Sequence, residues 1–250
     1  MKEHLYNYLL MLGDNSMILG HRLSELCGHG PSLETDIALT NISLDLYGQV
    51  RNIFGYAAEL QGAEHTEDTI AFLRKEREYR NVVLLEQPNA DFAHVIVRQF
   101  LFDAYQSLLL PALMKSSDKT IAAVAHKSIK ENKYHLRFSS SWVKRLGAGT
   151  EESKARIQNA LAHLFPFADE FFVEAEVEKE MNKLDIGPDV STLRETYYSL
   201  VEETLADSGL EKPDIQPRVV RGKNGIHSEH MGYILNELQY MQRAYPAMQW

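Results

Sequence analysis

A glutamate and a histidine lie about one helical turn apart in the segment KENKYHLRFSSSWVKRLG at positions 130–147. Four-helix bundles hold a pair of iron ions with a Glu-x-x-His motif on each of two helices and one glutamate on each of the other two. Here Glu131 precedes His135 by four residues, and the position three before the histidine is Asn132. The segment is therefore a candidate for half of a di-iron site, or for a degenerate form of one.

The number of available ligands favours the degenerate form. A pair of irons in a bundle needs about six protein ligands, of both carboxylate and imidazole type. Asn132 supplies a neutral amide where the motif has an anion, and no histidine occurs between His29 and His65 to form the other Glu-x-x-His. We therefore predict no bound metal, no bound cofactor and no catalytic residue. The degenerate, structural site would consist of Asp45, Glu131, Asn132 and His135.

Within that site His135 is expected to be a core histidine that is hydrogen-bonded to a carboxylate such as Asp45 or Glu131. It lies on a helical stripe of mostly small or apolar residues: Ile121, Ala125, Ser128, Asn132, His135, Ser139 and Trp142. Asp45 lies on another stripe, with Asn41, Asn52 and Glu59. That second stripe either lines a buried polar site or faces solvent.

A second group of candidate ligands is His227-Ser-Glu-His230. It could bind zinc with ligands from elsewhere. The alternative is that Glu229 occupies the first turn of a helix, where an anionic side chain suits the helix dipole. The aromatic and methionine-rich segment YMQRAYPAMQW follows, which has the composition of a protein interface. We predict possible partner contacts at His227, Glu229, His230, Tyr240 and Trp250.

Helices must position these residues, because apolar side chains recur at spacings of three and four along most of the chain. We expect long helices at about 14–28, 32–60, 91–114 and 118–147, with caps at Asp91 and Asp118. Shorter ones are expected at about 67–79, 151–172, 175–184, 190–208 and 226–243. The pattern predicts an all-α, ferritin-like four-helix bundle at about 12–148 with a C-terminal helical elaboration at about 151–250, in a single domain over 1–250.

Composition excludes several classes of function. A formal net charge of -9 on 250 residues argues against nucleic acid as a partner. No stretch is long and apolar enough to span a membrane. The one cysteine, Cys27, excludes internal disulfides, fits a reducing compartment and is expected to be a small buried residue. With no leader recognised at the start of the sequence, the expected location is the cytoplasm.

Several segments together resemble the C-type subunits of bacterial phenylacetyl-CoA epoxidases, which are ring 1,2-epoxidases. They are GHRLSELCGHGPSLETDIALTNISLDLYGQVRN, LLEQPNADFAHVIVRQFLF, KENKYHLRFSSSWVKRLGAGTEES and GIHSEHMGYILNELQYMQRAYPAMQW. The resemblance runs from about residue 12 to Trp250. It implies a ferritin-like fold and a non-catalytic subunit that binds and stabilises the related, catalytic A-type subunit, in an enzyme of aerobic phenylacetate degradation.

The resemblance also assigns the chemistry to other subunits. The A-type subunit would hold the di-iron centre, and a reductase subunit would carry flavin and an iron–sulfur cluster and use NADPH. Where the catalytic bundle of the family has Glu-x-x-His, this sequence has Asn132-x-x-His135. Two alternatives remain open at this stage. One is a ferritin-like protein that binds metal itself through His135, Glu131, Asp45 and the His227/His230 pair; the other is an adaptor unrelated to oxygenation.

Overall fold

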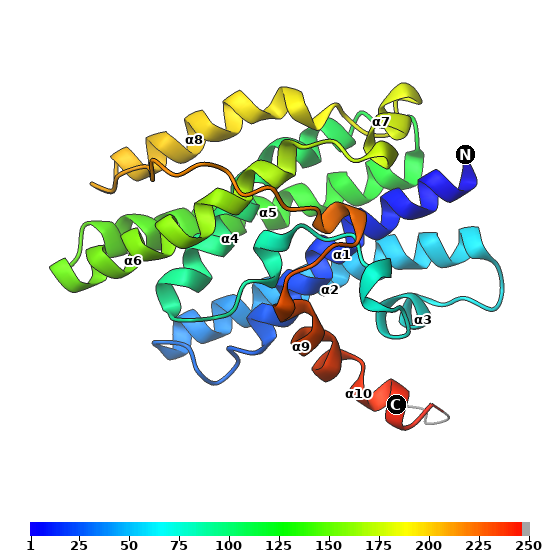
Figure 1. The fold of residues 1–250 in the computed structure, drawn as a ribbon, viewed down its shortest axis with the longest axis horizontal. Helices are drawn as coiled ribbons and strands as arrows, with labels where there is room; N and C mark the ends of the chain where they lie inside the picture. The colour runs from blue at the N-terminus through cyan, green and yellow to red at the C-terminus, as the bar shows by residue number, and fades with distance from the viewer. Residues whose placement is uncertain (247–250) are drawn as a thin grey trace. The chain divides into compact units, whose positions relative to one another are not determined.

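The chain is all-α over residues 1–246, which are the residues that the computed structural model describes (Figure 1). Within that range the β-type pairing is limited to an isolated antiparallel bridge between Arg221 and Ile226. No helix among these residues has the length and apolarity needed to cross a membrane. The all-α prediction is confirmed.

The chain divides into two compact units. The first contains residues 1–29, 34–87 and 220–246, and the second contains residues 30–33 and 88–219. The predicted boundary near residue 148 does not coincide with this division, because the C-terminal segment belongs with the first two helices. A single domain over 1–250 stays a prediction.

The first unit is built on α1 (Lys2–Ser24) and α2 (Leu33–Gln61). The two helices pack closely: a Cβ on Gly13 of α1 would lie 2.3 Å from the Phe54 ring of α2. One helical turn before the end of α1, the hydroxyl of Ser43 donates to the Gly20 carbonyl at 2.8 Å. The remaining elements are α3 (Glu67–Phe72), the 3₁₀ turns η1 (Glu76–Glu78), η2 (Val83–Glu86) and η5 (Gly222–Asn224), α9 (Glu229–Leu238) and α10 (Tyr240–Ala244).

The second unit is built on α4 (Phe92–Leu113) and α5 (Lys119–Gly147). Every residue from 93 to 106 of α4 is buried, whereas α5 buries one stripe. In Figure 1, α6 (Glu151–Leu164) and α8 (Arg194–Ala206) lie alongside this pair. The predicted caps are present, since Asp91 accepts from the His94 amide and Asp118 from the amides of Thr120 and Ile121. The unit also contains η3 (Phe165–Phe172), α7 (Glu176–Lys183) and η4 (Val190–Leu193).

Three local predictions were wrong. The first helix begins at Lys2, well before the predicted residue 14. The helix predicted to reach residue 172 changes to a 3₁₀ helix at Phe165, where Pro166 has no amide hydrogen to donate. Cys27, predicted to be buried, is an exposed free cysteine in the turn that follows α1.

Candidate functional site

The buried stripe of α5 follows the predicted positions closely. It consists of Ile121, Ala125, Ser128, Asn132, His135, Ser139, Val143 and Gly147. Trp142, which was predicted to continue this stripe, is half-buried on its flank and meets Phe92 edge-on at 4.9 Å between ring centroids. The polar members of the stripe therefore face the interior of the second unit.

Asp103 of α4 is the carboxyl group around which these polar groups gather. One carboxylate oxygen, Oδ1, accepts a hydrogen bond from Gln99 Nε2 at 2.7 Å, and Oδ2 accepts one from Ser139 Oγ at 2.7 Å. The backbone carbonyl of Asp103 accepts from the Asn132 side-chain amide at 3.2 Å. Burial raises the pKa of Asp103 well above its ordinary value, while the hydrogen bonds from Ser139 and Gln99 act in the opposite direction.

This cluster does not fit a pair of iron ions. Both Asp103 oxygens already accept from neutral donors, and burial opposes the charged form that a cation would need. The neighbouring Gln99 and Asn132 bring amides in place of anions. A site for two dications needs several carboxylates in addition to its imidazoles. Both carboxyl oxygens of Asp103 are instead used by hydrogen bonds from Gln99 and Ser139.

The four residues of the predicted degenerate site lie in different environments in the structure. Asn132 and His135 are buried on the α5 stripe, and Glu131 is half-buried on its edge. Asp45 is half-buried on α2 and belongs to the first unit. Its stripe partners Asn41, Asn52 and Glu59 are exposed, so the solvent-facing interpretation of that stripe is confirmed.

Sequence reasoning missed Asp103 and Gln99. The available signal was the run FAHVIVRQFLFDAYQSLLL, in which two charged residues, Arg98 and Asp103, interrupt a nearly continuous apolar helix. A helix that is apolar on all sides is buried, so its ionisable residues are buried as well and need partners. Periodicity alone placed the α5 stripe but could not identify the facing residue.

A second buried cluster forms in the first unit around the carboxylate of Glu86. His227 Nδ1 donates to Glu86 Oε1 at 2.6 Å, and its Nε2 donates to the Tyr79 carbonyl at 3.1 Å. Ser228 donates to Glu86 Oε2 from its amide at 2.8 Å and from its hydroxyl at 2.6 Å. Burial lowers the pKa of His227, but the hydrogen bond and charge of Glu86 outweigh it and leave the pKa raised.

This arrangement alters the expectation for the C-terminal contact residues. The His227 side chain is fully buried inside the first unit, so it presents no surface to a partner as folded. Glu229 and Tyr240 are exposed and His230 is half-buried. Trp250 lies outside the described residues. The partner role of these residues stays a prediction.

A third buried cluster ties the same C-terminal segment to α1. Arg74 pairs with Asp14 through both oxygens of the carboxylate and lies over the Tyr79 ring, 4.1 Å from its centroid. Gln239 then donates to the Arg74 carbonyl and to the Tyr79 hydroxyl, both at 2.8 Å. Residues 220–246 are thus hydrogen-bonded to the rest of the first unit at both ends of α9.

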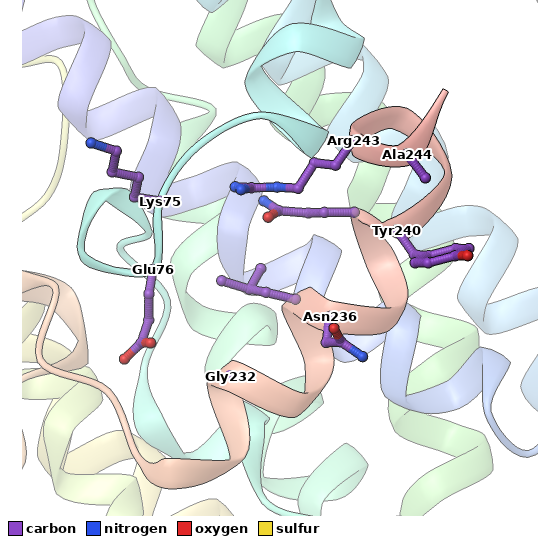
Figure 2. A pocket seen from close by; sticks show the side chains of 9 residues that line it. Lys75, Glu76, Gly232, Asn236, Tyr240, Arg243 and Ala244 are labelled. Atoms are coloured by element: carbon purple, nitrogen blue, oxygen red, sulfur yellow. The ribbon is translucent and has the colours of Figure 1, made fainter. Parts of the chain in front are cut away.

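A surface pocket of about 630 Å³ lies beside this segment and is lined by Lys75, Glu76, Gly232, Leu235, Asn236, Gln239, Tyr240, Arg243 and Ala244. Figure 2 shows Arg243 reaching from α10 toward the loop that carries Lys75, while Tyr240 points away from that loop. Arg243 donates to the Arg74 carbonyl at 3.2 Å. The pocket is an open groove whose polar groups serve the docking of α10.

Comparison with known proteins agrees with this architecture. A family described as phenylacetic acid catabolic protein matches residues 1–250. One relative, the C-type subunit of the 1,2-phenylacetyl-CoA epoxidase of Escherichia coli (strain K12), is 46% identical over 248 residues, which cover 99% of this chain and 100% of the relative. The resemblance stated from the sequence segments is confirmed. This all-α, ferritin-like chain belongs to the phenylacetic acid catabolic protein family.

Proposed function

We propose that this chain is a non-catalytic structural subunit of a phenylacetyl-CoA 1,2-epoxidase, which binds and stabilises the A-type, di-iron catalytic subunit in aerobic phenylacetate degradation. The name of the Escherichia coli relative supports the assignment to this enzyme. The observation that carries the non-catalytic role is the Asp103 cluster. Where a Glu-x-x-His motif would supply iron ligands, Asn132 donates its amide to the Asp103 carbonyl.

The physical reason for such a pair of subunits is that a catalytic bundle loses stability when it is open to its substrates. A bundle that admits a bulky thioester and O2 exposes apolar surface and carries polar groups with unsatisfied bonding capacity. A relative without an iron site can cover that surface, because it can use its interior polar residues for hydrogen bonds, as Gln99 and Ser139 do with Asp103. Stable interfaces of this kind bury more than ~2,000 Å² in total.

One face of α2 has the character of such an interface. Ile37 and Leu44 are seven residues apart and so project from the same side of the helix, and they are 51% and 62% exposed. Exposed apolar side chains gathered on one face indicate a contact with another protein. We propose other epoxidase subunits as the partners that cover this face.

The cofactors follow from the same proposal. The di-iron centre belongs to the A-type subunit, and flavin, the iron–sulfur cluster and NADPH belong to the reductase subunit. The chain described here contributes no ligand to either.

Co-expression with the A-type subunit of a phenylacetyl-CoA epoxidase from the same organism tests the proposal. We expect the two chains to co-purify and the catalytic subunit to melt at a higher temperature in the complex than alone, because a partner that binds only the folded form stabilises it. The Leu44→Asp variant should weaken the complex. Asn159→Asp, at an exposed position of α6, introduces the same charge away from this face and should not. Two chains that never co-purify, or a catalytic subunit whose melting is unchanged by this chain, would refute the assignment.

A further inference from the structure

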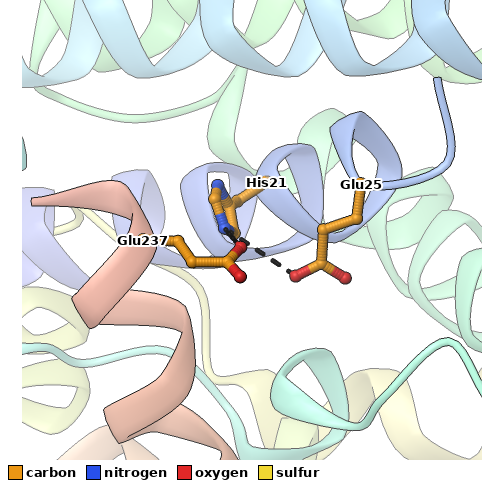
Figure 3. Close-up of side chains that lie close together, drawn as sticks. All are labelled: His21, Glu25 and Glu237. Carbon is orange, nitrogen blue, oxygen red and sulfur yellow. Dashed lines mark ion pairs between the residues drawn. The ribbon is translucent and has the colours of Figure 1, made fainter. Parts of the chain in front are cut away.

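Three potential metal ligands converge where α9 crosses the end of α1. Figure 3 shows His21 near the end of α1, Glu25 just beyond it and Glu237 on α9, with the two carboxylates directed toward the imidazole. His21 Nε2 lies 3.8 Å from Glu25 Oε1 and 3.8 Å from Glu237 Oε2. All three ligand atoms lie within 4.8 Å of one another, and residues 1–246 contain no other group of this kind.

The imidazole nitrogen of this group, His21 Nε2, is available to bind a cation. His21 Nε2 is buried and has no hydrogen-bond partner, although an unsatisfied buried polar atom is costly. A neutral imidazole with an available nitrogen is the form that binds a metal.

The carboxylates are within reach of tetrahedral geometry. Two ligands bound to zinc at about 2.1 Å lie about 3.4 Å apart in a tetrahedron. Each carboxylate oxygen is 3.8 Å from Nε2, so small movements suffice on that edge. The Glu237 side chain is 68% exposed and can rotate to close the remaining distance.

Arg22 orients one of these carboxylates. Its Nη1 donates to Glu25 Oε1 at 2.9 Å and Oε2 at 3.1 Å, and its Nη2 donates to the Glu86 carbonyl at 2.6 Å. A carboxylate has about four lone-pair positions, so Glu25 can keep this contact and still coordinate a cation. Metal-binding carboxylates are commonly held by a hydrogen bond of this type.

We propose that His21, Glu25 and Glu237 form a mononuclear site for a divalent transition metal of the zinc type, which clamps α9 to the end of α1. One imidazole and two carboxylates are ligands that zinc accepts, with water in the fourth position. Among the common divalent ions, a nitrogen-containing site of this kind favours zinc over manganese and ferrous iron. The site is separate from the Asp103 cluster and does not depend on the epoxidase assignment.

The site would hold the C-terminal segment in place. α9 already depends on the Glu86 cluster at its start and on Gln239 after its end. A metal bridge from Glu237 to α1 adds a third attachment on the outer side of the same helix. Because the ligands come together only in the folded chain, metal binding would stabilise the docked segment.

The test is a Zn²⁺ titration of the full-length chain without an affinity tag, followed by calorimetry. We expect one Zn²⁺ per chain to bind at micromolar concentration, and Glu237→Gln and His21→Gln each to weaken that event at least about tenfold. The matched controls are Glu229→Gln on the exposed part of α9 and His29→Gln in the exposed turn after α1, and both should bind as the wild type does. Chelation should lower the melting temperature of the wild type and of the controls.

Glu237 is an exposed side chain, so its variant separates loss of the metal from loss of the fold. Glu237→Gln should show normal circular dichroism and a melting temperature that no longer responds to zinc or chelator. The proposal is overturned if no stoichiometric binding is seen at free Zn²⁺ concentrations up to about 100 times the expected micromolar dissociation constant. It is equally overturned if Glu237→Gln and His21→Gln bind zinc as tightly as the wild type.

Discussion

At the scale of single residues, two buried carboxyl groups organise the interior, one in each unit. Asp103 is surrounded by neutral donors and has a raised pKa, whereas Glu86 is paired with His227, whose pKa is also raised. The first arrangement penalises the charged form of Asp103, and the second favours the charged form of His227. The two clusters therefore contribute to stability with different dependences on pH.

Replacing Asp103 with Asn should lower the stability only slightly at low pH and should raise it, relative to wild type, as the pH rises. A raised folded-state pKa means that the contribution of Asp103 is fully present below its ordinary value of 3.8 and is lost as the pH increases. Asn cannot ionise, and Gln99, whose Oε1 has no hydrogen-bond partner, can rotate to accept from the new amide. We expect Asp103→Asn to gain of the order of 1 kcal/mol relative to wild type between about pH 5 and pH 8.

Urea denaturation of both proteins at each pH measures this difference, and the comparison cancels the titration of other groups. Asp103→Ala serves as the contrasting variant. It leaves Gln99 and Ser139 without their acceptor and should be less stable than Asp103→Asn by about 2–3 kcal/mol at every pH, because neither variant titrates at this position. A variant Asp103→Asn that loses stability relative to wild type as the pH rises would contradict the account.

His227 should give stability that disappears in alkaline solution. Both of its ring nitrogens face acceptors, the Glu86 carboxylate and the Tyr79 carbonyl, and only the doubly protonated ring can donate to both. Because its pKa is raised, this stability is present below 6.5 and is lost as the pH rises through the raised value. We expect His227→Gln to unfold more easily than wild type by about 2 kcal/mol near pH 6, with a smaller difference near pH 9.

The measurement is the free energy of unfolding as a function of pH, with the exposed His29→Gln as control. A difference between wild type and His227→Gln that stays constant with pH would show that protonation of His227 does not contribute.

At the scale of elements, two helical glycines differ sharply in their surroundings. A Cβ at Gly13 would lie 2.3 Å from the buried Phe54 ring, whereas a Cβ at Gly48 would meet nothing within 4 Å. We expect Gly13→Ala to destabilise the chain by about 1–3 kcal/mol through overpacking of α1 against α2. Gly48→Ala should stabilise it by up to about 1 kcal/mol through helix propensity. Thermal melting of the two variants tests the close approach, and equal effects would argue against it.

Elements with a strong amphipathic pattern and a capping residue could be predicted from the sequence. α5 begins directly after Asp118 and buries Asn132 and His135 as expected, because its one apolar stripe fixes which side faces inward. α1 could not be predicted in full. Its first residues carry apolar side chains at helical spacing, but Gly13 followed by Asp14 and Asn15 has the pattern of a helix start. The helix continues across Gly13, where the backbone lies close to the Phe54 ring.

The sites, too, could be predicted from the sequence only in part. Periodicity shows which residues of one helix share a face, but it does not show which residue of another segment they meet. The pairing of His227 with Glu86 joins residues 141 positions apart, and no local pattern indicates it. The ligand count around Asn132 depended only on residue types and spacing, so the hypothesis of a degenerate site could be formed from the sequence alone.

At the scale of the whole molecule, the C-terminal segment completes the first unit. Glu86 captures the start of α9, and Gln239 contacts the Arg74 loop after its end. Removing residues 220–250 should therefore expose the buried Glu86 and Asp14 clusters while the helix pair α4 and α5 remains intact. Amide hydrogen exchange tests this, with protection expected to fall in residues 74–87 and α1 but not in α5. Uniform loss of protection over both units would indicate a single cooperative structure instead.

The central claim is that the chain assists epoxidation by holding the catalytic subunit and takes no part in the chemistry. Turnover of phenylacetyl-CoA per assembled complex, measured with His135→Gln in place of the wild-type chain, tests it most directly. The account predicts that this variant lowers the yield or the melting temperature of the complex but leaves turnover per complex unchanged. A complex that assembles and melts normally yet no longer epoxidises the substrate would contradict it.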